Sequence, residues 1–130
     1  MKNALSLALI ICLSLGGVGA QETSWTSEGN AYVVRYQSEL QPLQINKLHA
    51  WIIHVEDIDG TPVEGAIIEA TGGMPLHDHG LPTRPRMTAE IGAGDYRLDG
   101  MRFHMAGEWQ ITILIHVGES TDTVVITLTL

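Results

Sequence analysis

The chain has 130 residues, enough for one domain with a targeting segment but not for two full-sized domains. Seven Lys and Arg stand against 15 Asp and Glu, a net charge of −8, which excludes binding of nucleic acid or anionic membranes through a basic surface. Because 45% of the residues are hydrophobic, disorder of most of the chain is excluded as well.

The start of the chain, from Met1 to Ala20, has the layout of a secretory signal peptide. Lys2 precedes an apolar run from Ala4 to Leu15, and Val18 and Ala20 are small residues of the kind that signal peptidase requires before its cut. The run is shorter than the roughly 20 residues that span a bilayer as a helix. We therefore expect cleavage after Ala20, with an uncleaved membrane anchor as the alternative.

Cleavage would remove Lys2 but no acidic residue, so the mature protein would have six basic and 15 acidic side chains, a net charge of −9. It would also remove Cys12, the only cysteine, which excludes thiolate catalysis, thiol redox chemistry and disulfides in the mature protein. We expect residues 21–30 to be a poorly ordered polar lead-in and residues 31–130 to form one domain. The predicted location is the periplasm, without stable membrane insertion after cleavage.

Alternation of apolar and polar residues predicts β-strands along most of this domain, and no segment has a helical stripe. The clearest predicted strands are residues 32–36, 49–56, 63–71, 109–117 and 124–130. About seven short strands separated by turns predict an all-β fold, an immunoglobulin-like antiparallel β-sandwich, with a small closed barrel as the alternative. The predicted core comprises Trp51, Ile53, Ile68, Tyr96, Leu98, Phe103, Trp109, Ile111, Ile113 and Val124.

The segment from Gly72 to Pro85 is unlike the rest of the chain. It holds three prolines and three glycines, which predicts a stiff loop, neither helical nor a central strand. The loop carries Met74, His77 and His79, and the i, i+2 spacing places both imidazoles on one side of an extended chain. Thioether and imidazole groups together are ligands that suit copper.

A second cluster, His104 and Met105, has the same chemical character. If the two clusters meet at one end of the sandwich, they form a copper site without cysteine; its candidate ligands are Met74, His77, His79, His104 and Met105. The alternative is that the loop histidines hydrogen-bond to the loop itself and that Met105 fills the core. We expect the other three histidines, His49, His54 and His116, to have structural or solvent-facing roles.

The sequence does not favour an enzyme. It contains no Gly-x-Ser-x-Gly nucleophile motif, no phosphate-binding loop and no dinucleotide fingerprint. A binding protein is therefore the expected class.

Two motifs resemble the YtkA-like domain family. They are Gly-Gly-Met-Pro-x-His-x-His-Gly-Leu-Pro-Thr-x-Pro (72–85) and Gly-x-Tyr-x-Leu-x-Gly-Met-x-Phe-x-Met-x-Gly-x-Trp (94–109). Trp51 and the run Asp-Gly-x-Pro-Val-x-Gly-Ala (59–66) fit too, so the likeness covers about residues 45–130. The resemblance implies a small exported or membrane-tethered immunoglobulin-like domain. It also implies that the family's functional residues correspond to Met74, His77, His79 and Met105, which occupy the matching positions of the motifs.

The family is also linked to FixH-type proteins, which are implicated in copper delivery and in the assembly of haem–copper oxidases. FixH-type proteins have an N-terminal membrane helix where this sequence has a predicted cleavable signal. The expected function is that of an exported copper chaperone or buffer, with oxidase assembly as an implied role. Its expected partner is a copper-receiving membrane or periplasmic protein, and the alternative is an interaction module that binds no metal.

Overall fold

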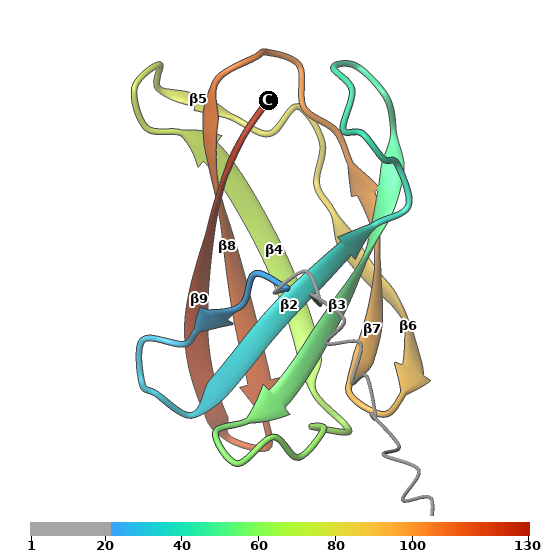
Figure 1. Cartoon of the computed structure of the whole chain (residues 1–130), viewed down its shortest axis with the longest axis vertical. Coiled ribbons are helices and arrows are strands. Elements are labelled where there is room, and N and C mark those ends of the chain that lie inside the picture. The colour runs from blue at the N-terminus through green and yellow to red at the C-terminus, as the bar shows by residue number, and fades with distance from the viewer. Residues whose placement is uncertain (1–21) are drawn as a thin grey trace, which may run out of the picture.

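A computed structural model describes residues 22–130, so the predicted signal peptide lies outside the described residues. The described part contains nine strands and no helix, which confirms the all-β prediction (Figure 1). The strands are β1 (Trp25–Thr26), β2 (Tyr32–Ser38), β3 (His49–Asp57), β4 (Ile67–Met74), β5 (His79–Gly80), β6 (Arg86–Gly92), β7 (Asp95–Met101), β8 (Glu108–Val117) and β9 (Ser120–Thr129). Over this range we find no helix with the length and apolar character needed to cross a membrane.

The strands form one continuous antiparallel sheet in the order β1-β2-β3-β7-β6-β4-β8-β9, with β5 paired to β4. It folds over on itself into two layers in an immunoglobulin-like arrangement, and we refer to these layers, β1-β2-β3-β7-β6 and β4-β8-β9 with β5, as the two sheets. These orders match the A-B-E-D and C-F-G sheets of immunoglobulin domains, so the sandwich prediction is confirmed. The structure has nine strands where we expected about seven, and the two short strands β1 and β5 contain only two residues each.

The two sheets are joined on both sides, so the sandwich approaches a closed barrel. On one side β4 pairs with β6 through Glu69 and Arg86. On the other side the amide of Glu28 donates to the carbonyl of Thr123 at 2.8 Å, and the amide of Gly29 donates to Oδ1 of Asp122 at 2.9 Å. Residues 22–30 are the described part of the expected lead-in at residues 21–30; they contain β1 and are hydrogen-bonded to β9.

All ten residues of the predicted core are buried. At the centre, Phe103 lies between Trp51 on β3 and Trp109 on β8, with ring centroids 6.1 and 5.3 Å away. In antibody domains the equivalents of β3 and β8 carry the disulfide that joins the sheets. Here contacts between aromatic rings hold the same two strands together.

The predicted strand at residues 63–71 is wrong at its start, because β4 begins at Ile67. Residues 63–66 instead connect the two sheets, with Gly65 at a φ of 72°. The hydroxyl of Tyr96 donates to the carbonyl of Val63 at 2.6 Å and accepts from the amide of Ala66 at 3.1 Å. These bonds to a side chain replace the strand pairing that the apolar alternation predicted.

Three connections meet at one end of the sandwich: residues 39–48, 75–78 and 102–107 (Figure 1). The amide of Asn46 donates to the carbonyl of Phe103 at 2.7 Å, which ties the first connection to the third. Gly107 and Leu130 exchange two backbone hydrogen bonds of 3.0 Å, so the C-terminus lies at this end as well. We call it the histidine end, because it carries His77, His79 and His104.

Candidate metal site

The β4–β5 turn depends on two glycines that have no room for a side chain. A Cβ at Gly73 would lie 2.9 Å from the carbonyl oxygen of His79, and one at Gly72 would lie 2.5 Å from Cδ1 of Ile111. The prediction of a loop from Gly72 is wrong for residues 72–74, because they belong to β4 and Gly72 and Gly73 pair with β8. The close packing at these glycines holds β5 against β4. Asp78, with a φ of 50°, turns the chain into His79.

The turn is held by backbone hydrogen bonds that do not involve the imidazoles. The amide of His77 donates to the carbonyl of Met74 at 3.1 Å, and the amide of Leu81 donates to the carbonyl of Gly72 at 3.0 Å. The loop shape is thus explained without a hydrogen-bonding role for either histidine side chain.

Met74 occupies a core position, not an exposed position on the loop where we expected a ligand. It is 1% exposed, and its Cε lies 2.8 Å from the point where a Cβ on Gly107 would be. On β4 it continues the inward alternation of Ile68 and Ala70, which are also buried. The thioether therefore lies beneath the β7–β8 connection and fills the end of the core.

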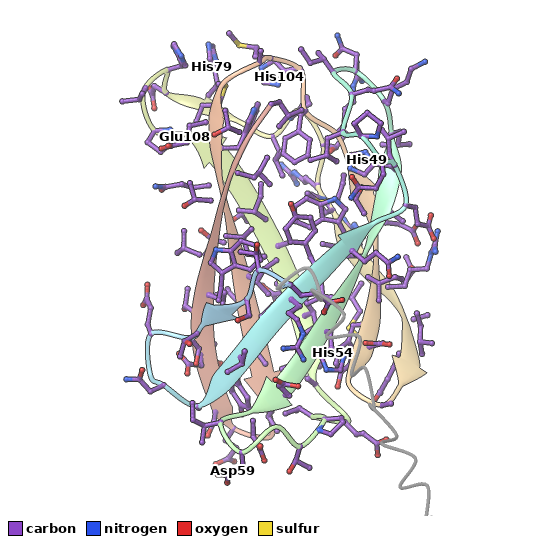
Figure 2. All side chains as sticks on the ribbon, viewed as in Figure 1. His49, His54, Asp59, His79, His104 and Glu108 are labelled. Atoms are coloured by element: carbon purple, nitrogen blue, oxygen red, sulfur yellow. The ribbon has the colours of Figure 1, made fainter. Side chains whose placement is uncertain are left out.

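The three histidines lie in a row across the histidine end. The ring centroids of His77 and His79 are 6.5 Å apart, and those of His79 and His104 are 5.7 Å apart. Figure 2 shows His79 and His104 together at this end of the molecule. The first two residues are exposed and His104 is half-buried. The structure thus brings together histidines of the β4–β5 hairpin and of the β7–β8 connection, which are far apart in the chain.

The imidazole nitrogens in this row have no competing partners. The rings of His49, His54 and His116 each form a hydrogen bond with another group. Within residues 22–130 no such bond involves the rings of His77, His79 or His104, and Nδ1 of His104 is buried without a partner. A buried polar atom without a partner is costly, and among the described residues this nitrogen shares that state with polar atoms of Arg102, His116 and Asp122. Of these four atoms it is the one that belongs to the histidine row.

The ring spacing suits a shared metal ion after small rotations. Metal–nitrogen bonds of about 2.0–2.1 Å place the centroids of two imidazoles on one ion about 5–6.5 Å apart. Over the described range no three His, Cys, Asp or Glu side chains already converge on a single point. Binding would therefore require rotation about χ1 and χ2 of the exposed side chains of His77 and His79.

The segment that carries His104 is held firmly. The ring of His104 packs edge-on against Trp109 with centroids 5.5 Å apart, and the indole of Trp109 donates to the carbonyl of Met105 at 3.1 Å. The Met105 side chain is half-buried against the core. Of the five predicted ligands, the structure places three imidazoles in one row, Met105 partly accessible beside His104, and Met74 inside the core.

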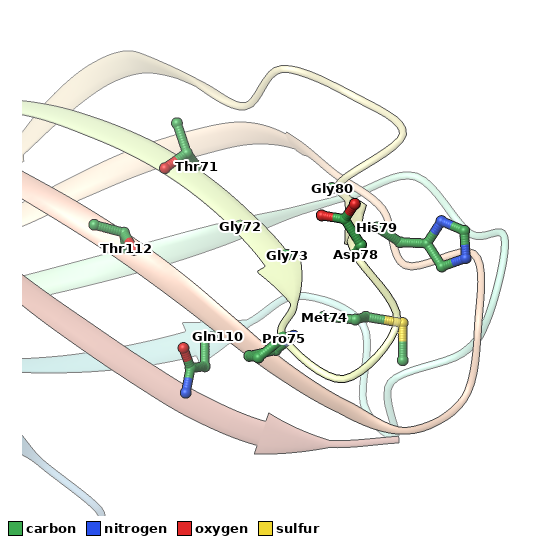
Figure 3. Close-up of a pocket in the computed structure, with 10 residues that line it drawn as sticks. All are labelled: Thr71, Gly72, Gly73, Met74, Pro75, Asp78, His79, Gly80, Gln110 and Thr112. Carbon is green, nitrogen blue, oxygen red and sulfur yellow. The ribbon is translucent and has the colours of Figure 1, made fainter.

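An open hollow of about 440 Å³ flanks the turn (Figure 3). His79 and Asp78 contribute to one side, and Gln110 and Thr112 of β8 contribute to another. In Figure 3 the imidazole of His79 projects beyond the end of β4, while Thr112 lies farther back along its strand. Water and small ligands can therefore reach the edge of the histidine row.

Sequence reasoning missed a polar network on the outer face of the first sheet. Nδ1 of His54 lies 2.6 Å from Asp95, and Nε2 lies 3.4 Å from Glu56. Arg35 makes a bidentate ion pair with Glu56, and its hydrogen bonds hold the pKa of that carboxyl below the usual value. The outward alternation of these residues on β2 and β3 was the available signal, but the strand register was needed to pair them.

Several other residues of the two sequence motifs shape the fold. Thr83 donates through Oγ1 to the carbonyl of Gly100 at 2.5 Å. Gly94 has a φ of 82°, and a Cβ there would overlap the carbonyl oxygen of Val55. With Tyr96 bonded between the sheets, these positions have structural explanations, whereas none of the three imidazoles at the histidine end is hydrogen-bonded to another described residue.

Comparison with known proteins places the fold and the family. A solved structure, a DUF4426 family protein from Pseudomonas aeruginosa PAO1, is similar with a TM-score of 0.54 over 82% of this chain and 94% of that chain. The sequence identity is 19%, so this likeness concerns the fold alone. No curated protein matches the chain. The family model described as YtkA-like matches residues 26–114, and the chain therefore belongs to the YtkA-like family.

Proposed function

We propose that this protein is an exported copper-binding domain that holds one ion at the histidine end and acts as a chaperone or buffer. The ion passes to a copper-receiving membrane or periplasmic protein. The observation that carries the proposal is the row of three imidazoles, with centroid separations of 6.5 and 5.7 Å and no hydrogen bonds to other described residues.

The donor set favours copper among the transition metals. Imidazole suits Cu, Zn, Ni and Fe, and a given nitrogen site binds Cu²⁺ most tightly of the common divalent ions. The hard ions Ca²⁺ and Mg²⁺ prefer oxygen ligands and are not expected to bind. Because Met74 is buried, Met105 is the thioether that remains available to support Cu(I) beside His104.

The test is a titration of residues 22–130 with Cu(II), with Cu(I) under anaerobic conditions, and with Zn²⁺. We expect one copper ion per chain with a dissociation constant below micromolar. Removal of two ligands in His77→Ala/His79→Ala, or of one in His104→Ala, should weaken binding by more than the roughly 10–100-fold that loss of an outer-sphere partner costs.

His116→Gln is the matched control, because it removes an imidazole from β8 outside the histidine end. It should leave copper affinity unchanged. Absence of stoichiometric binding, or an affinity that survives the double substitution, would contradict the proposal.

One observation favours a second candidate, a docking module that binds no metal. Leu76, at the tip of the β4–β5 turn, is 82% exposed, and Leu48 on the β2–β3 connection is 69% exposed. Such residues are suited to contact with another protein. If Leu76→Ser abolishes capture of a partner that His77→Ala/His79→Ala still binds, the docking function is favoured over the metal-dependent one.

A further inference from the structure

Aromatic rings form a continuous line from the histidine end through the core. The chain has only seven Phe, Trp and Tyr residues, and five of them belong to this line. Successive centroid distances are 5.5 Å for His104–Trp109, 5.3 Å for Trp109–Phe103, 6.1 Å for Phe103–Trp51, 4.0 Å for Trp51–Tyr36 and 5.6 Å for Tyr36–Trp25. All three tryptophans are members.

The line reaches the surface at both ends. At one end, the ring of His104 contacts that of His79, which is exposed. At the other end, Trp25 on β1 is half-buried and, with Tyr36, lines an open hollow of about 480 Å³. The buried indoles of Trp51 and Trp109 are therefore connected to solvent in two separate places.

The two buried indoles have different hydrogen-bond acceptors. The indole of Trp109 donates to a backbone carbonyl, that of Met105. The indole of Trp51 donates to Nε2 of His49 at 3.2 Å. Nδ1 of His49 lies 2.9 Å from the carbonyl of Lys47, and because a carbonyl only accepts, the ring proton is assigned to Nδ1 and the lone pair to Nε2.

This difference matters when an indole loses an electron. The N–H group of an oxidised tryptophan is strongly acidic, and an imidazole is a base whereas an amide carbonyl is not. Oxidised Trp51 can therefore lose its proton to His49, while oxidised Trp109 cannot lose its proton to Met105. The electron vacancy (the hole) is therefore more stable at Trp51 than at Trp109. Oxidation of the line consequently proceeds from the histidine end toward the core.

We propose that Trp51 and His49 form a proton-coupled one-electron redox pair that carries oxidising equivalents from the histidine end to Tyr36 and Trp25. One electron leaves Trp51 by way of Trp109 and reduces the oxidant by one electron. The indole proton moves to Nε2 of His49, which leaves a neutral tryptophan radical and an imidazolium.

The cycle closes when an electron from a small-molecule reductant such as ascorbate enters at Trp25 and the proton returns from His49 to Trp51. The oxidant is a strong one-electron acceptor, such as a radical that peroxide forms at a redox-active metal. The path would protect ligands of a copper site, but it requires no metal.

The experiment replaces the metal with a photo-oxidant. Residues 22–130 contain no cysteine, so Leu76→Cys provides a single attachment point on the exposed turn for a ruthenium polypyridyl complex. Flash–quench oxidation followed by transient absorption distinguishes the neutral tryptophan radical from the radical cation. We expect the neutral radical in the parent.

His49→Gln keeps an oxygen acceptor for the indole but removes the base. It should abolish the neutral-radical signal and leave the cation. Trp51→Phe should abolish it too and, by mass spectrometry, move the stable oxidation products from Trp25 and Tyr36 to Trp109 and Met105. Tyr32→Phe, an aromatic residue outside the line, is the control and should change neither readout.

Circular dichroism establishes whether each variant is folded. If only one of His49→Gln and Trp51→Phe folds, that variant alone is sufficient to test the proposal. A neutral radical of unchanged yield in His49→Gln, or unchanged product positions in Trp51→Phe, would overturn the proposal. Because no copper is used, these outcomes are independent of the metal titration. Failure of copper binding alone would leave the redox pair in place.

Discussion

Gly73 and Gly80 face each other across the β4–β5 pair, but they differ in their room for a side chain. A Cβ at Gly73 would lie 2.9 Å from the carbonyl of His79, whereas the nearest atom to a Cβ at Gly80 is 3.7 Å away. We expect Gly73→Ala to lower the free energy of unfolding by about 1–3 kcal/mol, because the turn must move.

Gly80→Ala, the matched control, should change this free energy by less than about 1 kcal/mol in either direction. Urea denaturation of both variants measures the difference. Equal midpoints would show that the turn is not held in place by the close approach at Gly73.

Substitutions of Met74 distinguish a packing role of its side chain from a role as a metal ligand. Met74→Leu conserves side-chain volume and should cost less than about 1.5 kcal/mol, while Met74→Ala should cost about 2–5 kcal/mol because it opens a cavity beneath Gly107. Copper affinity of Met74→Leu should equal that of the parent. A loss of affinity in a variant that keeps its stability would instead place the thioether among the ligands.

Sequence patterns predicted the long paired strands well. The alternation in β3 and β8 identified Trp51 and Trp109 as inward-facing, and both are fully buried. We gave β6 no residue range from the sequence, because five of its seven residues are exposed and it has no apolar alternation. β1 and β5 contain two residues each, too few for any periodicity.

The candidate site could also be predicted only in part from the sequence. Clustering in the sequence was enough to nominate His77, His79 and His104, and the sheet topology brings these rings into one row. It was not enough to place Met74, since Gly72 and Gly73 interrupt the apolar alternation that would have revealed β4 continuing to that residue. The candidate donor groups could be named from the sequence alone, whereas the direction of each side chain required the strand register.

Asp122 closes the sandwich on the side away from the β4–β6 pair. Its Oδ1 accepts from the amides of Gly29 and Thr123 at 2.9 and 2.8 Å. Burial raises the pKa of Asp122, but the hydrogen bonds from Ser27 and from these amides outweigh burial and lower the pKa below its usual value. The charged carboxylate is therefore favoured in the folded state.

This lowered pKa predicts a contribution to acid unfolding. A carboxyl group whose pKa is lower in the folded state stabilises the protein above its unfolded pKa of about 3.9, and the stabilisation is lost as the pH falls through the folded pKa. Asp122→Asn should lower the free energy of unfolding by about 1.5–3 kcal/mol at neutral pH. The difference from the parent should shrink below about pH 4.

Denaturant unfolding at several pH values measures this difference. Asp59→Asn makes the same change of charge on the exposed β3–β4 connection and serves as the control (Figure 2). A difference between Asp122→Asn and the parent that stays constant down to pH 3 would rule out this origin for the acid sensitivity.

The paired hydrogen bonds between Gly107 and Leu130 have a practical consequence for anyone who assays the protein. They attach the end of the chain to the same connection that carries His104, so a polyhistidine tag placed after Leu130 would deliver many extra imidazoles beside the three under test. Purification tags therefore belong ahead of Glu22. The same pairing makes the amide resonances of Gly107 and Leu130 natural NMR reporters of any ion that binds there.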